Sequence, residues 1–242
     1  MRSWIFGLLS ATVITVAVPA LALASSLQVA PVNIEVPAPG AASTITLKNS
    51  GSGSVNAQIR VFKWTQVDGK DQLVPTKEVV ASPPAVKLGP GKSSVVRIVR
   101  RSKAPAATEE SFRLVVDEVP KAPTATQAGV GFAMRYSVPV FFSAAGQETS
   151  LNWTAKVSGG QLRIVAENDG GRRVRLADLK VVKGGKSVSV SQGLAGYVLG
   201  ESSHVWLVKG GAKFAAPGST IKIIAKSDNG PIEATAKVVA SN

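Results

Sequence analysis

The sequence predicts an all-β protein made of two sandwich domains, and three observations carry this prediction. First, 242 residues suffice for two domains, because domain sizes cluster at about 100–150 residues. Second, apolar residues alternate with polar ones in short runs rich in Val, Ile and Thr, as in half-buried strands. Third, turn residues interrupt these runs at regular intervals, with no amphipathic helix of useful length between them.

The expected strands lie between clusters of Gly, Pro, Asn and Asp. The apolar residues that mark strands in the first half are Ile45, Leu47, Ile59, Val61, Trp64, Val95, Ile98, Leu114 and Val116. Turns are expected at 37–40, 49–53, 68–69, 89–91, 159–160, 169–171, 184–185, 210–211 and 228–231. Each half therefore holds enough strands for a sandwich of the immunoglobulin kind, which needs about 100 residues.

The boundary between the domains is expected at 143–148, just after the apolar strand that ends in Val140-Phe141-Phe142. Residues 25–144 would form the first domain and residues 145–242 the second. No sequence repeat links the two halves.

The first 24 residues have the layout of a cleaved signal peptide. Arg2 is followed by an apolar run from Trp4 to Ala24 without an acidic residue, and small residues close it at Ala22-Leu23-Ala24. A membrane anchor is the alternative, since about 20 apolar residues also span a bilayer. No cationic stop-transfer cluster follows the run, so we expect cleavage and a mature protein outside the cytoplasm.

Composition limits the chemistry that the chain supports. It has no Cys and a formal charge of +13, so stability depends on core packing, and an anionic partner is favoured. Such a charge also serves solubility alone, and export argues against nucleic acid. His204 is the only His, and no acid lies at motif spacing from it, so we expect no enzyme, no cofactor and no metal site. Glycoside hydrolysis stays open because it needs only two carboxylates.

Two motifs in the first half resemble a known family. The first is the stretch 83–91, Pro-Pro-Ala-Val-Lys-Leu-Gly-Pro-Gly, followed by Ser94-Val95-Val96-Arg97. Its Pro-Gly pair makes a tight turn that leads into a strand. The second is the strand 110–120, which ends in an acidic residue, an aliphatic residue and Pro. In this order and spacing the motifs resemble periplasmic pilus-assembly chaperones of the chaperone-usher pathway.

Weaker matches extend the resemblance over most of residues 27–232. They are Leu47-Lys48-Asn49, the strand 57–61, Val165-Ala166-Glu167-Asn168 and the turn 227–230. The lack of Cys and the strand 134–141 are similar to the archaic branch, which serves spore-coat-like or biofilm pili. The resemblance implies two immunoglobulin-like domains with a cleft between them, in the periplasm.

The resemblance also implies a mechanism in which the last strand of the first domain completes the incomplete sandwich of a pilus subunit. The segment 128–135 fits this task because Val130, Phe132 and Met134 form an apolar face at period two, while Gly131 and Ala133 are small. An ordinary core strand of the first domain is the alternative. An exposed apolar edge is a hazard unless a partner covers it.

A carboxylate anchor is a further implication. In the family, two basic residues in the cleft hold the terminal carboxylate of the subunit, one on the first strand and one on the last strand of the first domain. Here Asn33 occupies the first position, and Arg135 is the nearest base on the last strand. Arg97 and Arg100 are substitutes on another strand. Charge-assisted hydrogen bonds from Arg would fix register as well as affinity.

Some members hold their domains together with a salt bridge from an Arg that follows the last strand. Glu110 and Asp228 match its acidic positions, but Ser143 and its neighbours supply no Arg, so we expect the domains to be held differently or less rigidly. The implied partners are pilus subunits and an outer-membrane usher, and self-association of the free protein stays open.

Two alternative functions are open at this point. A structural pilus or surface sandwich protein, such as an adhesin or pilin, is disfavoured by the two-domain length and the Pro-rich motif. A basic polysaccharide- or lipopolysaccharide-binding module needs exposed aromatic platforms. Strand alternation places most of Trp64, Trp153 and Trp206 in a core.

Overall fold

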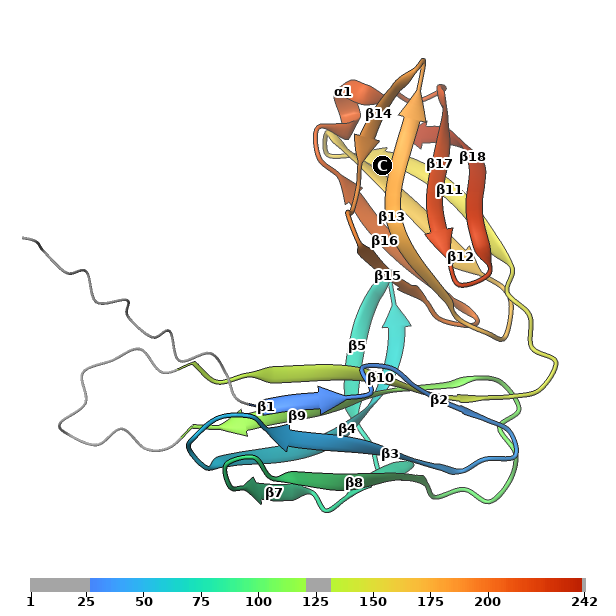
Figure 1. The fold of residues 1–242 in the computed structure, drawn as a ribbon. Coiled ribbons are helices and arrows are strands. Elements are labelled where there is room, and N and C mark those ends of the chain that lie inside the picture. Colours follow the sequence, from blue (N-terminus) through green and yellow to red (C-terminus); the bar gives the residue numbers. More distant parts are fainter. Residues whose placement is uncertain (1–26, 121–131, 241–242) are drawn as a thin grey trace, which may run out of the picture.

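The structure is a computed structural model that describes residues 27–120 and 132–240. The signal peptide predicted over 1–24 and the predicted donor residue Val130 lie outside these ranges. Figure 1 shows two β domains, with the second at the end of a hairpin that projects from the first. The predicted all-β fold is confirmed, because the described chain contains only one short helix, α1 (Gly211–Phe214). In these ranges no helix is long and apolar enough to cross a membrane.

The first domain packs two sheets against each other. One sheet has the strand order β1 (Leu27–Ala30), β3 (Ala42–Asn49), β8 (Ser93–Arg100) and β6 (Val79–Ser82). The other has the order β2 (Ile34–Pro37), β10 (Arg135–Ser143), β9 (Glu110–Val119), β4 (Val55–Val67) and β5 (Lys70–Pro75), with β7 (Ala85–Leu88) paired to β4. We call this second sheet the cleft sheet, because its outer face meets the second domain.

The core of the first domain lies between its sheets and contains Ile45, Leu47 and Ile59, as the alternation predicts. Two predicted strand residues face the other way. In β8 the core residues are Val96 and Ile98, whereas Val95 is 58% exposed, because neighbouring residues of a strand point to opposite faces. Trp64 is buried, but on the outer face of the cleft sheet.

The first stretch of chain contributes to both sheets. β1 pairs with β3, and after a bend at Val32 and Asn33 the chain continues as β2, parallel to the end of β10. This parallel pairing covers only residues 140–143 of β10. Within the described ranges, no strand pairs with the preceding part of that edge.

The second domain is one eight-stranded sheet that encloses its own core. Its strands are β11 (Leu151–Ser158), β12 (Gln161–Asn168), β13 (Val174–Lys183), β14 (Lys186–Ser189), β15 (Leu194–Val198), β16 (Ser202–Val208), β17 (Thr220–Ser227) and β18 (Gly230–Ala240). Leu162, Ile164 and Ile223 are completely buried in this core. Trp206 is part of this core, and the partly buried Trp153 stacks on it at 6.0 Å, so neither ring is an exposed aromatic platform.

Candidate partner-binding site

The two domains meet at a small apolar cluster of their own. Trp64 and Phe141 of the cleft sheet pack against Tyr197 and Leu199 of the second domain, and all four side chains are buried. The rings of Trp64 and Tyr197 meet edge to face at 5.3 Å, a favourable aromatic geometry. The second domain therefore buries Trp64, which explains why this residue departs from the core pattern of its strand.

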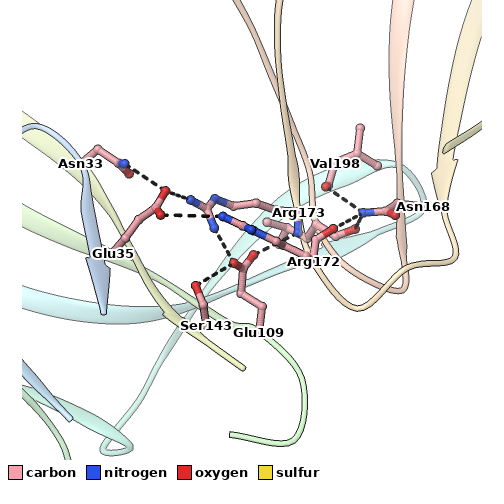
Figure 2. Close-up of polar contacts among 9 residues, drawn as sticks. Asn33, Glu35, Glu109, Ser143, Asn168, Arg172, Arg173 and Val198 are labelled. Atoms are coloured by element: carbon pink, nitrogen blue, oxygen red, sulfur yellow. Dashed lines mark hydrogen bonds and ion pairs between the residues drawn. The ribbon is translucent and has the colours of Figure 1, made fainter. Parts of the chain in front are cut away.

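An ion-pair cluster, drawn in Figure 2, lies next to the ring of Phe141. Arg173 of the second domain contacts the carboxylates of Glu35 and Glu109 of the first, and its guanidinium lies 3.5 Å from the ring centroid of Phe141. Its backbone N–H also donates to Glu109 over 3.0 Å. The side chains of Arg173 and Glu109 are 3% and 1% exposed. Buried charges of opposite sign must stay paired, so this cluster fixes the domains relative to each other.

Asn168 shapes the turn that presents Arg173. Its side-chain amide donates to the backbone carbonyl of Arg172 over 2.7 Å (Figure 2). The same amide donates to the Leu199 carbonyl over 3.1 Å, and the side-chain oxygen accepts the N–H of Gly170. These bonds satisfy backbone groups that the turn would otherwise leave unpaired.

The acids that sequence comparison suggested for the interdomain salt bridge lie elsewhere. Glu110 binds Arg100 within the first domain over 2.6 and 2.7 Å, and Asp228 lies 3.5 Å from Arg175 within the second. Glu109, the residue before Glu110, makes the interdomain contact instead. The expectation that the domains are held differently is correct, and an Arg from the second domain supplies the charge.

A second contact is made by the β4–β5 hairpin, which projects toward the second domain in Figure 1. The side chain of Gln66 donates to the Tyr197 carbonyl over 2.8 Å and accepts the Leu199 N–H over 3.0 Å. At the tip of the hairpin, the Val205 N–H donates to the Gly69 carbonyl over 3.0 Å.

His204 lies at the same contact. Its Nδ1 is 3.2 Å from Gln66 Nε2 and 3.8 Å from an Asp71 oxygen, and its ring lies against Trp206. Burial lowers the pKa of His204, and the charge of Asp71 opposes that effect.

One groove lies at the contact between the domains, and none of the predicted anchor residues lines it. This groove of ≈ 410 Å³ is lined by Gln66 of the first domain and by residues 167–169 and 201–203 of the second. Among the described residues, no group of three His, Asp or Glu side chains is placed to share a metal ion.

The three predicted anchor residues lie in three different surroundings. Arg97 is exposed on the sheet that faces away from the second domain, between Thr44 and Ser82 in register. Arg100 is 9% exposed, and it donates to Glu110 and to the carbonyls of Ser102 and Ala104.

Arg135 is the one predicted anchor residue on the cleft sheet. Its side chain is 67% exposed and contacts Asp117, which Arg60 also binds over 2.5 Å. These contacts lower the pKa of Asp117, with the hydrogen bond from Arg135 as the largest cause.

Arg113 is a candidate anchor that sequence reasoning missed. It lies on β9, directly opposite Pro139 of β10, with its guanidinium 3.7 Å from the Trp64 ring centroid and 5.6 Å from that of Tyr197. Burial is the main cause that lowers its pKa, but an Arg stays charged at neutral pH. Among the described residues, no carboxylate makes an ion pair with it. The signal in the sequence is an Arg inside an apolar run, Phe112-Arg113-Leu114-Val115.

Two of the three predicted donor residues, Phe132 and Met134, lie just before β10 (Arg135–Ser143), and Val130 lies outside the described residues. Phe132 is 77% exposed and Met134 is 38% exposed. By alternation they continue the face of Tyr136 and Val138, which pack on or in the core of the first domain. The core-facing row of β10 thus extends past the end of its own domain as two uncovered apolar side chains.

Comparison with known proteins agrees with this architecture. A sequence model of the pili and flagellar-assembly chaperones, PapD N-terminal domain, matches residues 26–147. The chain therefore belongs to this family of pilus-assembly chaperones, which are periplasmic chaperones rather than enzymes. A search of curated protein sequences found no match.

Solved structures extend the likeness over both domains. The chaperone in the CsuC–CsuE pre-assembly complex of archaic Csu pili from Acinetobacter baumannii is 26% identical, with a TM-score of 0.67 over 90% of this chain and 100% of that one. The YadV chaperone is 16% identical, with a TM-score of 0.62 over 87% and 98%. SafB of Salmonella enterica, solved with the SafA pilin, is 17% identical, with a TM-score of 0.59 over 88% and 97%. The resemblance read from the sequence is confirmed.

Proposed function

We propose that this protein holds a pilus subunit by adding a strand to it and delivers that subunit to an outer-membrane usher. One observation carries the proposal: among the described strands none pairs with the edge of β10 before residue 140, and this edge leads to the exposed side chains of Phe132 and Met134. Strand addition uses both features, because main-chain hydrogen bonds give affinity and alternate side chains entering the partner give specificity. Val130 would extend the same apolar row.

The unpaired edge also needs a partner for physical reasons. Exposed strand edges promote aggregation, and proteins protect them with charge or cover them. Arg135 is a charged residue on this edge, whereas Phe132 and Met134 present apolar surface to water. A subunit that lacks one strand would cover this surface and gain a core strand for itself.

We propose Arg113, assisted by Arg135, as the anchor for the terminal carboxylate of the subunit. Arg113 lies in register with Pro139, one residue before the paired segment of β10, and Asn33 lies just before β2 in the neighbouring stretch. Arg113 thus lies on the strand next to β10, opposite the residue that precedes its paired segment. Stacking on Trp64 leaves its N–H groups for a carboxylate, with which a guanidinium forms paired hydrogen bonds.

Co-expression with a pilus subunit tests strand addition. We expect a soluble one-to-one complex with the wild-type chain, and its loss with Phe132→Asp or Met134→Asp, because a buried charge in the partner's core is costly. Val95→Asp is the matched control, since Val95 is exposed on the other sheet. All three variants should melt at the wild-type temperature. Normal capture by both donor variants would disprove the assignment.

Export and domain limits complete the proposal. We propose that the signal peptide ends at residue 24, that the mature protein works in the periplasm, and that 25–144 and 145–242 are its domains. The mass of the protein recovered from the periplasm tests the first point, with Ser25 as the expected first residue. A chain that keeps residues 1–24 would contradict it.

A further inference from the structure

Two backbone hydrogen bonds show toward which neighbouring strand the peptide group of each residue in β10 points. The Glu118 N–H donates to the Met134 carbonyl over 2.9 Å, so even-numbered residues of β10 direct their peptide groups toward β9. The Ala38 N–H donates to the Ser143 carbonyl over 3.0 Å, so odd-numbered residues direct theirs toward the β2 edge. The peptide groups at the unpaired part of this edge therefore belong to Arg135 and Ser137.

Pro139 stands where the paired part of this edge begins. It is the odd-numbered residue just before the first β2 pair, Val140 with Ile34, and Pro has no N–H to give to a ladder. On the other side of the strand the antiparallel pairing with β9 passes through it unbroken. The missing N–H thus affects only the edge that faces β2, the position where Pro is tolerated in a strand.

The chain before β2 turns away at the same level. Val32 and Asn33 form a bend rather than strand, and Val32 is 72% exposed. In a continued parallel ladder the carbonyl of Val32 would accept an N–H from residue 139, and its own N–H would bond to the carbonyl of Ser137. Pro139 removes the first of these two bonds.

We propose that Pro139 keeps the donor edge open by ending the β2 ladder, so that the peptide groups of Arg135 and Ser137 stay available to a subunit strand. The proposal rests on the function proposed above. Without Pro139, residues 32 and 33 would extend β2 along β10, and the Val32 N–H would bond to the Ser137 carbonyl. The chaperone would then cover its own binding edge.

Pro139→Val tests the proposal, because Val restores the N–H and keeps most of the buried volume. In the free protein, amide hydrogen exchange at Val32 should slow in the variant, and the melting temperature should stay equal or rise. Subunit capture should fall by about fivefold for each hydrogen bond denied to the partner, given about 1 kcal/mol per bond.

A second substitution separates this mechanism from simple damage. Val32→Pro in the Pro139→Val background removes the Val32 N–H that the longer ladder needs, so capture should return, whereas Val32→Ala should leave it low. Unchanged Val32 exchange in Pro139→Val would overturn the proposal even if no subunit is captured. So would unfolding of both Pro139→Val and Pro139→Ala. Failure of the wild type to capture a subunit would instead reject strand addition itself.

Discussion

Arg173 and Glu109 form a buried ion pair that joins the two domains. Glu109 accepts both the backbone N–H and the guanidinium of Arg173, and neither side chain has more than 3% of its surface exposed. Glu35 accepts a further bond from the same guanidinium. Each residue comes from a loop or the edge of a sheet, so the sandwich cores do not depend on them.

Arg173→Ala should lower the free energy of unfolding by about 3–5 kcal/mol, because it leaves Glu109 buried without a counter-charge. Urea denaturation followed by tryptophan fluorescence measures this loss, since Trp64 lies in the joint. Arg175→Ala is the control: Arg175 is 45% exposed, and an exposed pair contributes about 1 kcal/mol or less. Equal losses in the two variants would show that the buried pair does not couple the domains.

Arg113→Ala should weaken subunit capture by about 30-fold or more, because losing one partner of a buried charge pair costs about 2–5 kcal/mol. Competition binding with a labelled subunit measures the change. Arg97→Ala, on the sheet that faces away, should bind as the wild type does. If a subunit lacking its terminal carboxylate still distinguished Arg113→Ala from the wild type, the anchor role would be refuted.

Gly69→Ala should destabilise the contact at the tip of the β4–β5 hairpin. Gly69 has φ +72°, and an added Cβ would lie 2.2 Å from Val205 Cγ2. Gly91→Ala is a close control, with φ +69° and no atom within 4 Å of the added Cβ. The left-handed backbone alone costs about 1–2 kcal/mol at either position. Gly69→Ala should therefore lower the melting temperature more than Gly91→Ala does. Equal losses would mean that Val205 moves away from the added methyl group without cost.

Stability should fall as the pH is lowered from about 7 to about 5, in part through His204. Burial holds its folded pKa below the ordinary value of about 6.5. In this window the unfolded chain binds the proton first, so protons favour unfolding. Asp71 faces the ring and limits the effect, while Gln66 and Trp206 contribute no charge. His204→Gln should show a flatter pH dependence of melting temperature than the wild type, and parallel curves would contradict this.

The alternation of apolar and polar residues predicted the fold well, because a strand buried on one face carries apolar side chains at alternate positions, such as Ile45 and Leu47. It placed Val95 in a strand correctly but did not decide its burial, because Val95 and Val96 are both apolar and only packing decides which of them is buried. Trp64 shows the same limit, because the second domain provides its burial.

The site was predicted less completely for a related reason. The resemblance pointed to the donor segment and period two chose the face of Phe132 and Met134, whose donor role stays a prediction although both side chains are exposed. Arg113 and Arg173 could not, because their significance depends on aromatic rings and carboxylates that are distant in sequence. An Arg in a strand otherwise reads as a solvated residue.

Asn168 has a counterpart in the first domain. Asn49 also ends a strand, donates to the carbonyls of Gly53, Leu88 and Gly89, and accepts the N–H of Gly51. The same side chain therefore closes the same kind of turn twice, once beside a free surface and once at the domain joint. The Asn that holds the turn and the residues that the turn presents can therefore change independently. Sequence drift in residues 169–173 could retune how firmly the two halves are held while each sandwich remains intact.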